Sequence, residues 1–161
     1  MGKLGIIMLD TKFPRIPGDI GNDDTFSFEI EKKVVEGADP KRVVIEGDPS
    51  LLTPFVNAAK ELEKSGAAAI TTSCGFLSMF HKELAAAVNI PMFTSSLLQV
   101  KSISDMIPHG KCVGILTANS NSLGEKHFRG VGIENINKVV YGMEGTYFHD
   151  AIVGNDTVLD V

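Results

Sequence analysis

One cysteine of the sequence lies in a setting that favours chemistry. Cys74 occupies the TTSCGF segment at positions 71–76, where an apolar segment gives way to a polar turn. A thiol between a strand and a helix faces the positive end of the helix dipole, which lowers its pKa from about 8.5 toward neutrality. The resulting thiolate could act as nucleophile or base, and Gly75 leaves backbone room for a ligand. The alternative is a small buried hydrophobe, the usual state of a free cysteine.

Small hydroxyl and amide side chains follow each of four predicted strands. They stand at Asp10-Thr11, at Ser73, at Thr94-Ser95-Ser96 and at Thr117-Ala118-Asn119. Ligands of open α/β sheets bind beyond the carboxyl ends of the strands. These side chains, together with free helix N–H groups, suit a small anion such as a carboxylate or phosphate. The same residue types are ordinary helix caps, so a purely structural role stays open.

Two charged residues near the first predicted strand could contact a substrate. Arg15 lies between two prolines in a long loop over residues 11–25, and could clamp a substrate carboxylate or remain a solvated loop charge. Asp10 could orient a proton carrier or a substrate ammonium, or it could cap the loop that follows. The sequence leaves these alternatives open.

The other thiol and the imidazoles suggest structural roles. Cys112 lies within the apolar run 111–116 and is expected in the core of a strand. His81 and His127 stand beside charged residues in predicted helices and are expected at the surface. The cysteines and histidines show no zinc-ligand spacing, and no nucleotide-binding glycine motif follows a strand. We therefore expect no disulfide, no metal and no cofactor.

A repeated strand–loop–helix pattern positions these residues. Continuous apolar runs predict strands buried on both faces, and 3–4 spacing of apolar residues predicts helices. The expected strands cover residues 4–9, 67–72, 91–94, 111–117 and 139–143, with weak strand character in 26–36 and 43–46. The expected helices cover residues 48–66, 76–88, 95–107 and 122–128.

This alternation is typical of an α/β fold, with a parallel sheet flanked by helices in flavodoxin-like or Rossmann-like lobes. The break at Ile107-Pro108-His109-Gly110 predicts a first lobe over residues 1–108, which carries Cys74, and the start of a similar second lobe over residues 109–161. A glycine, apolar residues and a short polar loop at 4–10 recur at 113–119, which suggests a duplicated half.

Composition excludes several classes of protein. The chain has 161 residues, of which 43% are apolar and 22% charged, and a net charge of −5. These values exclude global disorder, and with no basic patch a nucleic-acid partner is not expected. No apolar run is long enough to span a bilayer, and no cleavage site follows the first apolar run. We therefore expect a cytoplasmic protein without a membrane partner.

Five segments, in this order and spacing, resemble the aspartate/glutamate/hydantoin racemase superfamily. They are GIIMLDT at 5–11, PRIPGD at 14–19, ITTSCGF at 70–76, IPMFTSS at 90–96 and VGILTAN at 113–119. The match runs from about Lys3 to about Phe128. The resemblance implies two similar lobes with the active site in the cleft between them, and cofactor-independent chemistry at the carbon next to a carboxylate. In the family's racemases one thiolate removes the α-proton and a second cysteine returns a proton to the opposite face; Cys74 matches the first.

The resemblance also implies a set of substrate contacts for a small carboxylate or amino acid. Arg15 joins this set as the candidate carboxylate clamp. The matching loops contain Asp10, Thr11, Ser73, Gly75, Phe76, Thr117, Ala118 and Asn119.

The family's second catalytic cysteine has no match in the sequence. It lies in the second lobe, well after the strand that matches 111–117, and the sequence reaches Val161 before that motif. Cys112 cannot replace it, because a mid-strand position lies away from the carboxyl end of the strand. The apolar pattern at 158–161 predicts a truncated chain with an incomplete second lobe. Its apolar surface could form a homodimer or cause aggregation.

The leading hypothesis is therefore a cofactor-independent isomerase of the racemase family. It would act on aspartate, glutamate or a related small carboxylate, with the Cys74 thiolate as the base that abstracts the α-proton. A truncated chain should not complete a two-base racemisation. The alternatives are a single-cysteine isomerase or decarboxylase of the same fold, and a non-catalytic protein that binds a small carboxylate.

Overall fold

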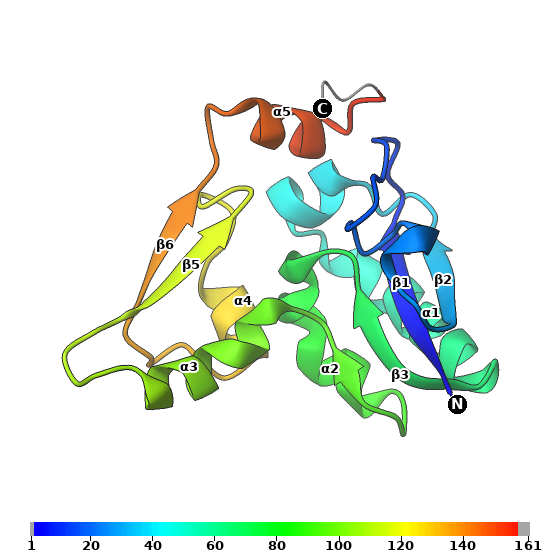
Figure 1. Ribbon diagram of the computed structural model, residues 1–161, viewed down its shortest axis with the longest axis horizontal. Helices are drawn as coiled ribbons and strands as arrows, with labels where there is room; N and C mark the ends of the chain where they lie inside the picture. The colour runs from blue at the N-terminus through cyan, green and yellow to red at the C-terminus, as the bar shows by residue number, and fades with distance from the viewer. Residues whose placement is uncertain (1, 158–161) are drawn as a thin grey trace.

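The computed structural model describes residues 2–157 and contains two separate sheets (Figure 1). The first sheet has four strands in the order β2-β1-β3-β4, and the second pairs β5 with β6. All these pairings are parallel. The predicted α/β class, with parallel strands flanked by helices, is confirmed. The strands are β1 (Lys3–Leu9), β2 (Ile30–Val35), β3 (Ala67–Thr72), β4 (Met92–Phe93), β5 (Val113–Thr117) and β6 (Lys138–Gly142).

Helices of two kinds connect the strands. The α-helices are α1 (Leu52–Lys64), α2 (His81–Ala86), α3 (Val100–Met106), α4 (Glu125–Gly130) and α5 (Tyr147–Gly154). The shorter helical turns are η1 (Asp23–Thr25), η2 (Lys41–Glu46), η3 (Pro49–Leu51), η4 (Gly75–Phe80) and η5 (Ser96–Gln99).

The core of the four-stranded sheet follows from local signals in the sequence. Ile6 and Ile7 in β1 are both 0% exposed, as expected for a strand covered on both faces. The segment η3–α1 begins where the Asp48 carboxylate accepts the Ser50 N–H at 2.9 Å. It ends before Gly66, which has a φ of +94°. The predicted start and end of this helix are confirmed.

The strand expected at residues 43–46 is wrong. These residues form the helical turn η2, in which Val43 and Val44 are both buried. The Asp39 carboxylate accepts the Arg42 N–H at 2.9 Å near the start of the turn, and Gly47 ends it with a φ of +55°. The β-branched side chains suggested a strand, but capping and burial override that weak preference.

The expectation for Cys112 is also wrong, because this residue is exposed. Strand β5 begins only at Val113, after a turn in which the Lys111 N–H donates to the Pro108 carbonyl at 3.1 Å. This turn leaves Cys112 outside the strand pairing. The thiol lies at the amino end of β5, opposite the end that carries Thr117.

Two histidines expected at the surface lie inward. His127 is 0% exposed, because α4 packs against η4. The approach is so close that a Cβ atom at Gly130 would lie 1.9 Å from the Ser78 carbonyl oxygen. His81 is half-buried, and its Nδ1 pairs with the Thr94 hydroxyl at 3.0 Å. Charged neighbours along the sequence do not show which side of a short helix faces the core.

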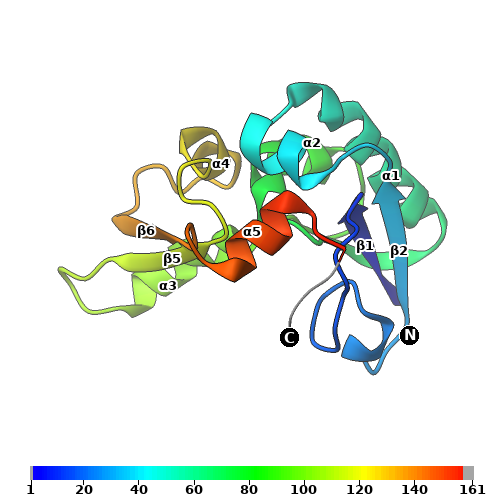
Figure 2. The same cartoon turned by 90° about the horizontal axis from the view of Figure 1, so that it is seen from above.

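Helix α5 was not predicted from the sequence. The Thr146 hydroxyl caps it by accepting the His149 N–H at 3.3 Å. From the end of β6 the helix crosses over the space between the two sheets toward the loop after β1 (Figures 1 and 2). The Lys12 N–H donates to the Asn155 side chain at 2.6 Å, which ties the end of α5 to that loop.

The chain changes from one sheet to the other between Phe93 and Val113. The division into lobes over residues 1–108 and 109–161 stays a prediction. The apolar pattern at 158–161, from which truncation was expected, lies outside the described residues. Within residues 2–157 no helix has the length and apolar character that crossing a bilayer requires.

Candidate active site

A cavity of about 280 Å³ lies between the two sheets, at the carboxyl ends of β3, β4 and β5. The strand order of the first sheet reverses between β1 and β3, the position at which such sheets bind ligands. The residues that line the cavity are Pro40, Val44, Ser73, Cys74, Gly75, Phe76, Ser95, Ser96, Leu97, Ile115, Leu116, Thr117, Ala118, Leu123, Ile152 and Val153. None of these residues carries a formal charge, so a ligand ion would meet hydroxyl groups and apolar walls.

Cys74 lies in this cavity with a half-buried side chain. Burial raises its pKa to about 11, although the N–H groups of Phe76 and Leu77 and the charge of Arg15 act in the opposite direction. The sequence led us to expect a lowered pKa, and the structure corrects that direction. Helix η4 is a 3-10 helix of only six residues, and the lowering effect of its first N–H groups on the thiol pKa does not offset the loss of water.

Several hydroxyl groups around Cys74 hold the strand ends together. The Ser73 hydroxyl accepts the Leu9 N–H at 3.2 Å and so joins the ends of β3 and β1. The Thr72 hydroxyl donates to the Thr94 carbonyl at 2.8 Å and joins β3 to the residue after β4. A Cβ atom at Gly75 would lie 3.1 Å from the Ser95 Oγ, so glycine permits this close approach. For part of the predicted cluster of small polar residues at the strand ends, the observed role is therefore the purely structural one that the sequence left open.

Residues after β5 form the opposite wall of the cavity. Thr117 and Ala118 line it, and their contact with a substrate stays a prediction. Asn119 does not line it, and its side chain instead accepts the Ser122 N–H at 3.0 Å and contacts His149 at 3.3 Å. Asn119 therefore caps its own loop, which is the role that the sequence had left open for residues of this type.

Three further predicted contacts, Asp10, Thr11 and Arg15, also lie outside the residues that line the cavity. The Asp10 carboxylate accepts the Gly37 N–H at 3.0 Å, which matches the loop-capping alternative. The guanidinium of Arg15 donates to the Thr11 hydroxyl at 2.9 Å and to the Asp19 carboxylate at 2.7 Å. Arg15 is therefore held by its own loop and reaches Cys74 through its electric field. The structure thus shows what Asp10, Thr11 and Arg15 contact, while their roles in substrate binding stay predictions.

Sequence reasoning missed other parts of the cavity wall. Ser95 and Ser96 were noted as a strand end but were not counted as contacts, although they follow β4 as directly as Ser73 follows β3. Ile152 and Val153 close the cavity from α5. The Thr146 cap could have signalled that helix, but nothing local shows where the helix docks. Residues 2–157 contain no cluster of three His, Cys, Asp or Glu side chains suited to a metal ion.

Curated relatives match most of the chain, although no family model matches. Dimethylsulfoniopropionate lyase of Durusdinium sp. clade D is 32% identical over 127 residues, which are 77% of this chain and 42% of that protein. Dimethylsulfoniopropionate lyase 7 of Emiliania huxleyi is 28% identical over 162 residues, covering 96% of this chain and 47% of that protein. The chain thus spans less than half the length of these relatives.

Solved structures define the fold. A candidate Asp/Glu racemase from Yersinia pestis aligns over 95% of this chain and 69% of its own length, with a TM-score of 0.58 and 17% identity. The chain has the aspartate/glutamate racemase fold. A liganded variant of arylmalonate decarboxylase aligns over 89% of this chain and 62% of its own length, with a TM-score of 0.59 and 17% identity. The resemblance to the superfamily is confirmed at the level of the fold, which several reactions share.

The expectation of an amino-acid racemase is wrong. The curated relatives of this racemase-fold chain are named as lyases. A lyase and a racemase can share the first step, removal of a proton next to a carboxylate, and differ in what the carbanion then does. Removal of that proton by Cys74 stays a prediction from the sequence motifs, and the motifs contain no signal for the second step. The lyase names favour the alternative with a decarboxylase-like or other bond-breaking reaction over the racemase.

Proposed function

We propose that this chain is part of a lyase that cleaves the carbon–sulfur bond of dimethylsulfoniopropionate or a similar small sulfonium carboxylate. The observation that carries the proposal is the position of Cys74, in an uncharged cavity at the strand ends, in a chain whose relatives are named for this activity. The cavity volume of about 280 Å³ suits a substrate of this small size.

The reaction would be an elimination. The Cys74 thiolate takes a proton from the carbon next to the carboxylate, and the electrons of that C–H bond form a carbon–carbon double bond. The bond from the neighbouring carbon to sulfur breaks, and its electron pair leaves with sulfur as neutral dimethyl sulfide. Acrylate remains, and Cys74 ends as a thiol. Because the C–H acid is weak, a thiolate with a raised pKa is a stronger base for this step.

The substrate itself would help Cys74 to ionise. A thiol with a pKa of about 11 is almost wholly protonated near neutral pH. A sulfonium cation bound in this uncharged cavity would attract the thiolate across a medium of low dielectric constant and lower that pKa. Elimination would then convert the sulfonium group to neutral dimethyl sulfide, and Cys74 would be a protonated thiol again. The arrangement favours a substrate that carries a sulfonium group over one without a positive charge.

The hydroxyl groups of the cavity would receive the carboxylate end. Ser95, Ser96 and Thr117 provide hydroxyl groups on two walls, and such donors bind a carboxylate without a second charge. Decarboxylation is the second candidate reaction, favoured by the shared fold with arylmalonate decarboxylase. It comes second because that likeness concerns the fold alone, whereas the lyase names belong to relatives at higher identity.

The test is release of dimethyl sulfide, measured by headspace gas chromatography, with acrylate followed by NMR. Cys74→Ser should lose at least about 100-fold in rate, the usual contribution of a positioned base. Cys112→Ser is the matched control, because that thiol is exposed at the far end of β5, and it should match the wild type. Equal rates for wild type and Cys74→Ser, or no release by the wild type, would contradict the proposal.

A further inference from the structure

Helix α4 carries a buried histidine that the proposed elimination does not use. His127 is 0% exposed, and its Nδ1 accepts the Gly124 N–H at 3.1 Å. An accepting Nδ1 carries no proton, so the proton of the neutral ring lies on Nε2. Burial, with a smaller effect from Lys126, lowers the pKa of His127 to about 4, so the ring is neutral near pH 7.

The ring proton of His127 is buried without a partner. Neither Nε2 of His127 nor Oγ of Ser78 has a hydrogen-bond partner among the residues that the structure describes. Ser78 is also 0% exposed and lies on η4, which faces α4. Unsatisfied buried polar groups destabilise a fold, and an apolar side chain of similar size would avoid that cost at position 127. The histidine therefore calls for an explanation beyond packing.

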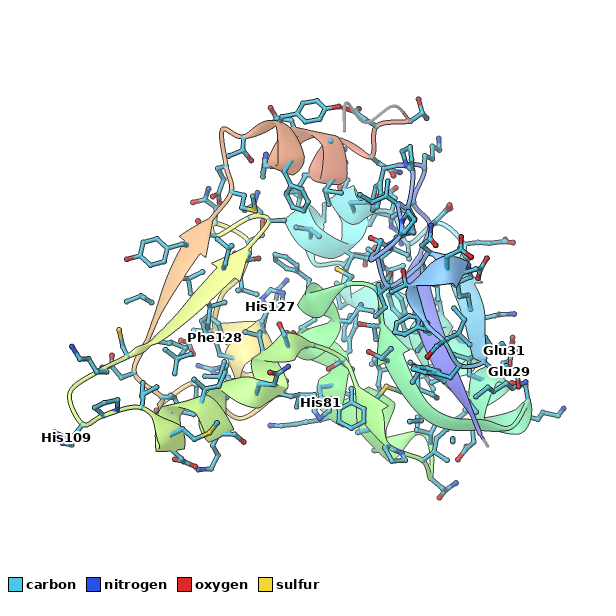
Figure 3. All side chains as sticks on the ribbon, viewed as in Figure 1. Glu29, Glu31, His81, His109, His127 and Phe128 are labelled. Carbon is cyan, nitrogen blue, oxygen red and sulfur yellow. The ribbon has the colours of Figure 1, made fainter. Side chains whose placement is uncertain are left out.

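The imidazole contacts the turn that carries Cys74. Its ring meets the Phe76 ring edge to face, with centroids 5.2 Å apart and planes at 88°. Phe76 is 5% exposed and lines the cavity, and its N–H acts to lower the pKa of the Cys74 thiol. Figure 3 shows His127 in the interior between the two sheets, whereas His109 lies at the outer end of the loop before β5. The Phe76 ring therefore lies between His127 and the turn that carries the thiol.

We propose that His127 is a positioning residue for Cys74: its ring, fixed by Gly124, holds Phe76 in place and so limits the access of water to the half-buried thiol. The close approach of Gly130 to Ser78 holds α4 against η4, which makes this contact rigid. His127 takes no proton in the reaction. The proposal rests on Cys74 as the base of the proposed function. The test measures the reactivity of the thiol itself. The positioning proposal can therefore fail when the lyase activity is present, and it can hold when that activity is absent.

The test measures alkylation of Cys74 by iodoacetamide at pH 8, in a Cys112→Ser background because the Cys112 thiol is exposed. His127→Asn removes the ring and keeps an acceptor for Gly124, whereas His127→Phe keeps the ring. Without the ring contact Phe76 admits more water to the thiol, and the thiol pKa falls toward its ordinary value. Each unit of that fall gives about tenfold more thiolate. We expect alkylation at least about tenfold faster in His127→Asn, and within about threefold of the parent in His127→Phe.

Ser78→Ala is the matched control, because it removes the other unpartnered polar atom without touching the ring contact. Its alkylation rate should equal that of the parent, and its melting temperature should be equal or higher. Parent-like alkylation of His127→Asn would overturn the proposal. So would equal acceleration in His127→Phe or Ser78→Ala, since general loosening would then explain the effect.

A second variant covers the case in which His127→Asn does not fold by circular dichroism. Phe76→Ala removes the same ring contact from its other side and should give the same acceleration, while unchanged alkylation would overturn the proposal. In the dimethyl sulfide assay, His127→Asn should lower kcat and leave KM within about twofold, as expected for a group that acts on the base and leaves substrate binding unchanged.

Discussion

Two turns of the molecule follow the carboxyl ends of parallel strands, and their donors are used differently. The turn after β3 presents Cys74 to the cavity, and the N–H groups of Phe76 and Leu77 act to lower the pKa of its thiol. The turn after β5 directs its donors at a carboxylate of its own chain. Glu144 accepts from the Ser120 hydroxyl at 2.8 Å and from the Asn121 N–H at 3.3 Å.

The difference shows why a cluster of small polar residues is a weak functional signal. Both turns have the composition that suits a bound anion, and the second does bind a carboxylate. That carboxylate belongs to Glu144, 24 residues further along the chain than Ser120. The donors of the second turn therefore bind a side chain of the same protein, while Thr117 and Ala118 of that turn still line the cavity.

The two turns also differ in what holds them in place. Helix α4 packs on the first through Gly130 and His127, so that turn should respond to changes in side-chain volume. Hydrogen bonds to a charged group hold the second, so it should respond to pH. Gly130→Ala and Glu144→Gln test this contrast, and His127→Phe tests the buried neutral imidazole at the first turn.

Gly130→Ala should have the largest effect. Its Cβ would lie 1.9 Å from the Ser78 carbonyl oxygen, a backbone atom that cannot move aside without shifting η4. We expect the free energy of unfolding in urea to fall by about 3 kcal/mol, as for severe overpacking. Gly114→Ala is the control, because nothing lies within 4 Å of its Cβ position, and it should stay within about 0.5 kcal/mol. Similar losses in both variants would contradict a tight contact at α4.

His127→Phe should change how stability depends on pH. The folded state lowers the pKa of His127 from 6.5 to about 4, so protonation favours the unfolded chain. The wild type should therefore be fully stable above pH 6.5 and lose stability as the pH falls toward 4. His127→Phe should lack this part of the loss. Melting curves from pH 7.5 to 4 test it, and parallel curves for the two proteins would count against a buried neutral imidazole.

Glu144→Gln should have the smallest effect. Its own backbone N–H and the Ser120 hydroxyl are the main causes that lower the pKa of Glu144 to about 2. Since the unfolded value is higher, the stabilisation is present above about pH 4.5 and is lost as the pH falls toward 2. Glu144→Gln should lower the melting temperature at pH 7 by less than Gly130→Ala.

The difference in melting temperature between the wild type and Glu144→Gln should disappear in acid. Glu134→Gln removes an exposed carboxylate elsewhere and is the matched control for the change in net charge. A difference that persists unchanged at pH 3, or an equal loss in Glu134→Gln, would show that the carboxylate does not hold the second turn.

Much of the fold could be predicted because its signals are local. The buried run of β1 and the capped, glycine-terminated segment η3–α1 carry their patterns within a few residues. The predictions for residues 43–46, Cys112 and His127 failed where a turn or a distant partner decided the outcome. Valine content cannot show that η2 is capped, and the sequence around His127 cannot show that η4 covers it.

The candidate site was predicted in part for the same reason. Cys74, Ser73, Gly75 and Phe76 are neighbours in sequence and necessarily share one turn, so they reach the cavity together. Asp10, Thr11 and Asn119 were assigned because they follow predicted strands, and Arg15 because it lies between two prolines in a loop. Each of the four side chains forms hydrogen bonds with loop residues. The reaction could not be read from these residues, since the fold supports several and the relatives' names overturned the racemase.

The sequence by itself determined that a thiol stands at the end of a buried parallel strand. Apolar periodicity specifies the strand, and parallel strands bring their carboxyl ends, and the residues that follow them, to one edge. Only the tertiary structure decided the state of that thiol and which turn stays open to a ligand. Those outcomes depend on Arg15, His127, Glu144 and helix α5, which reach the site from distant parts of the chain. Burial and electrostatic fields are sums over neighbours in space, and a linear pattern does not contain them.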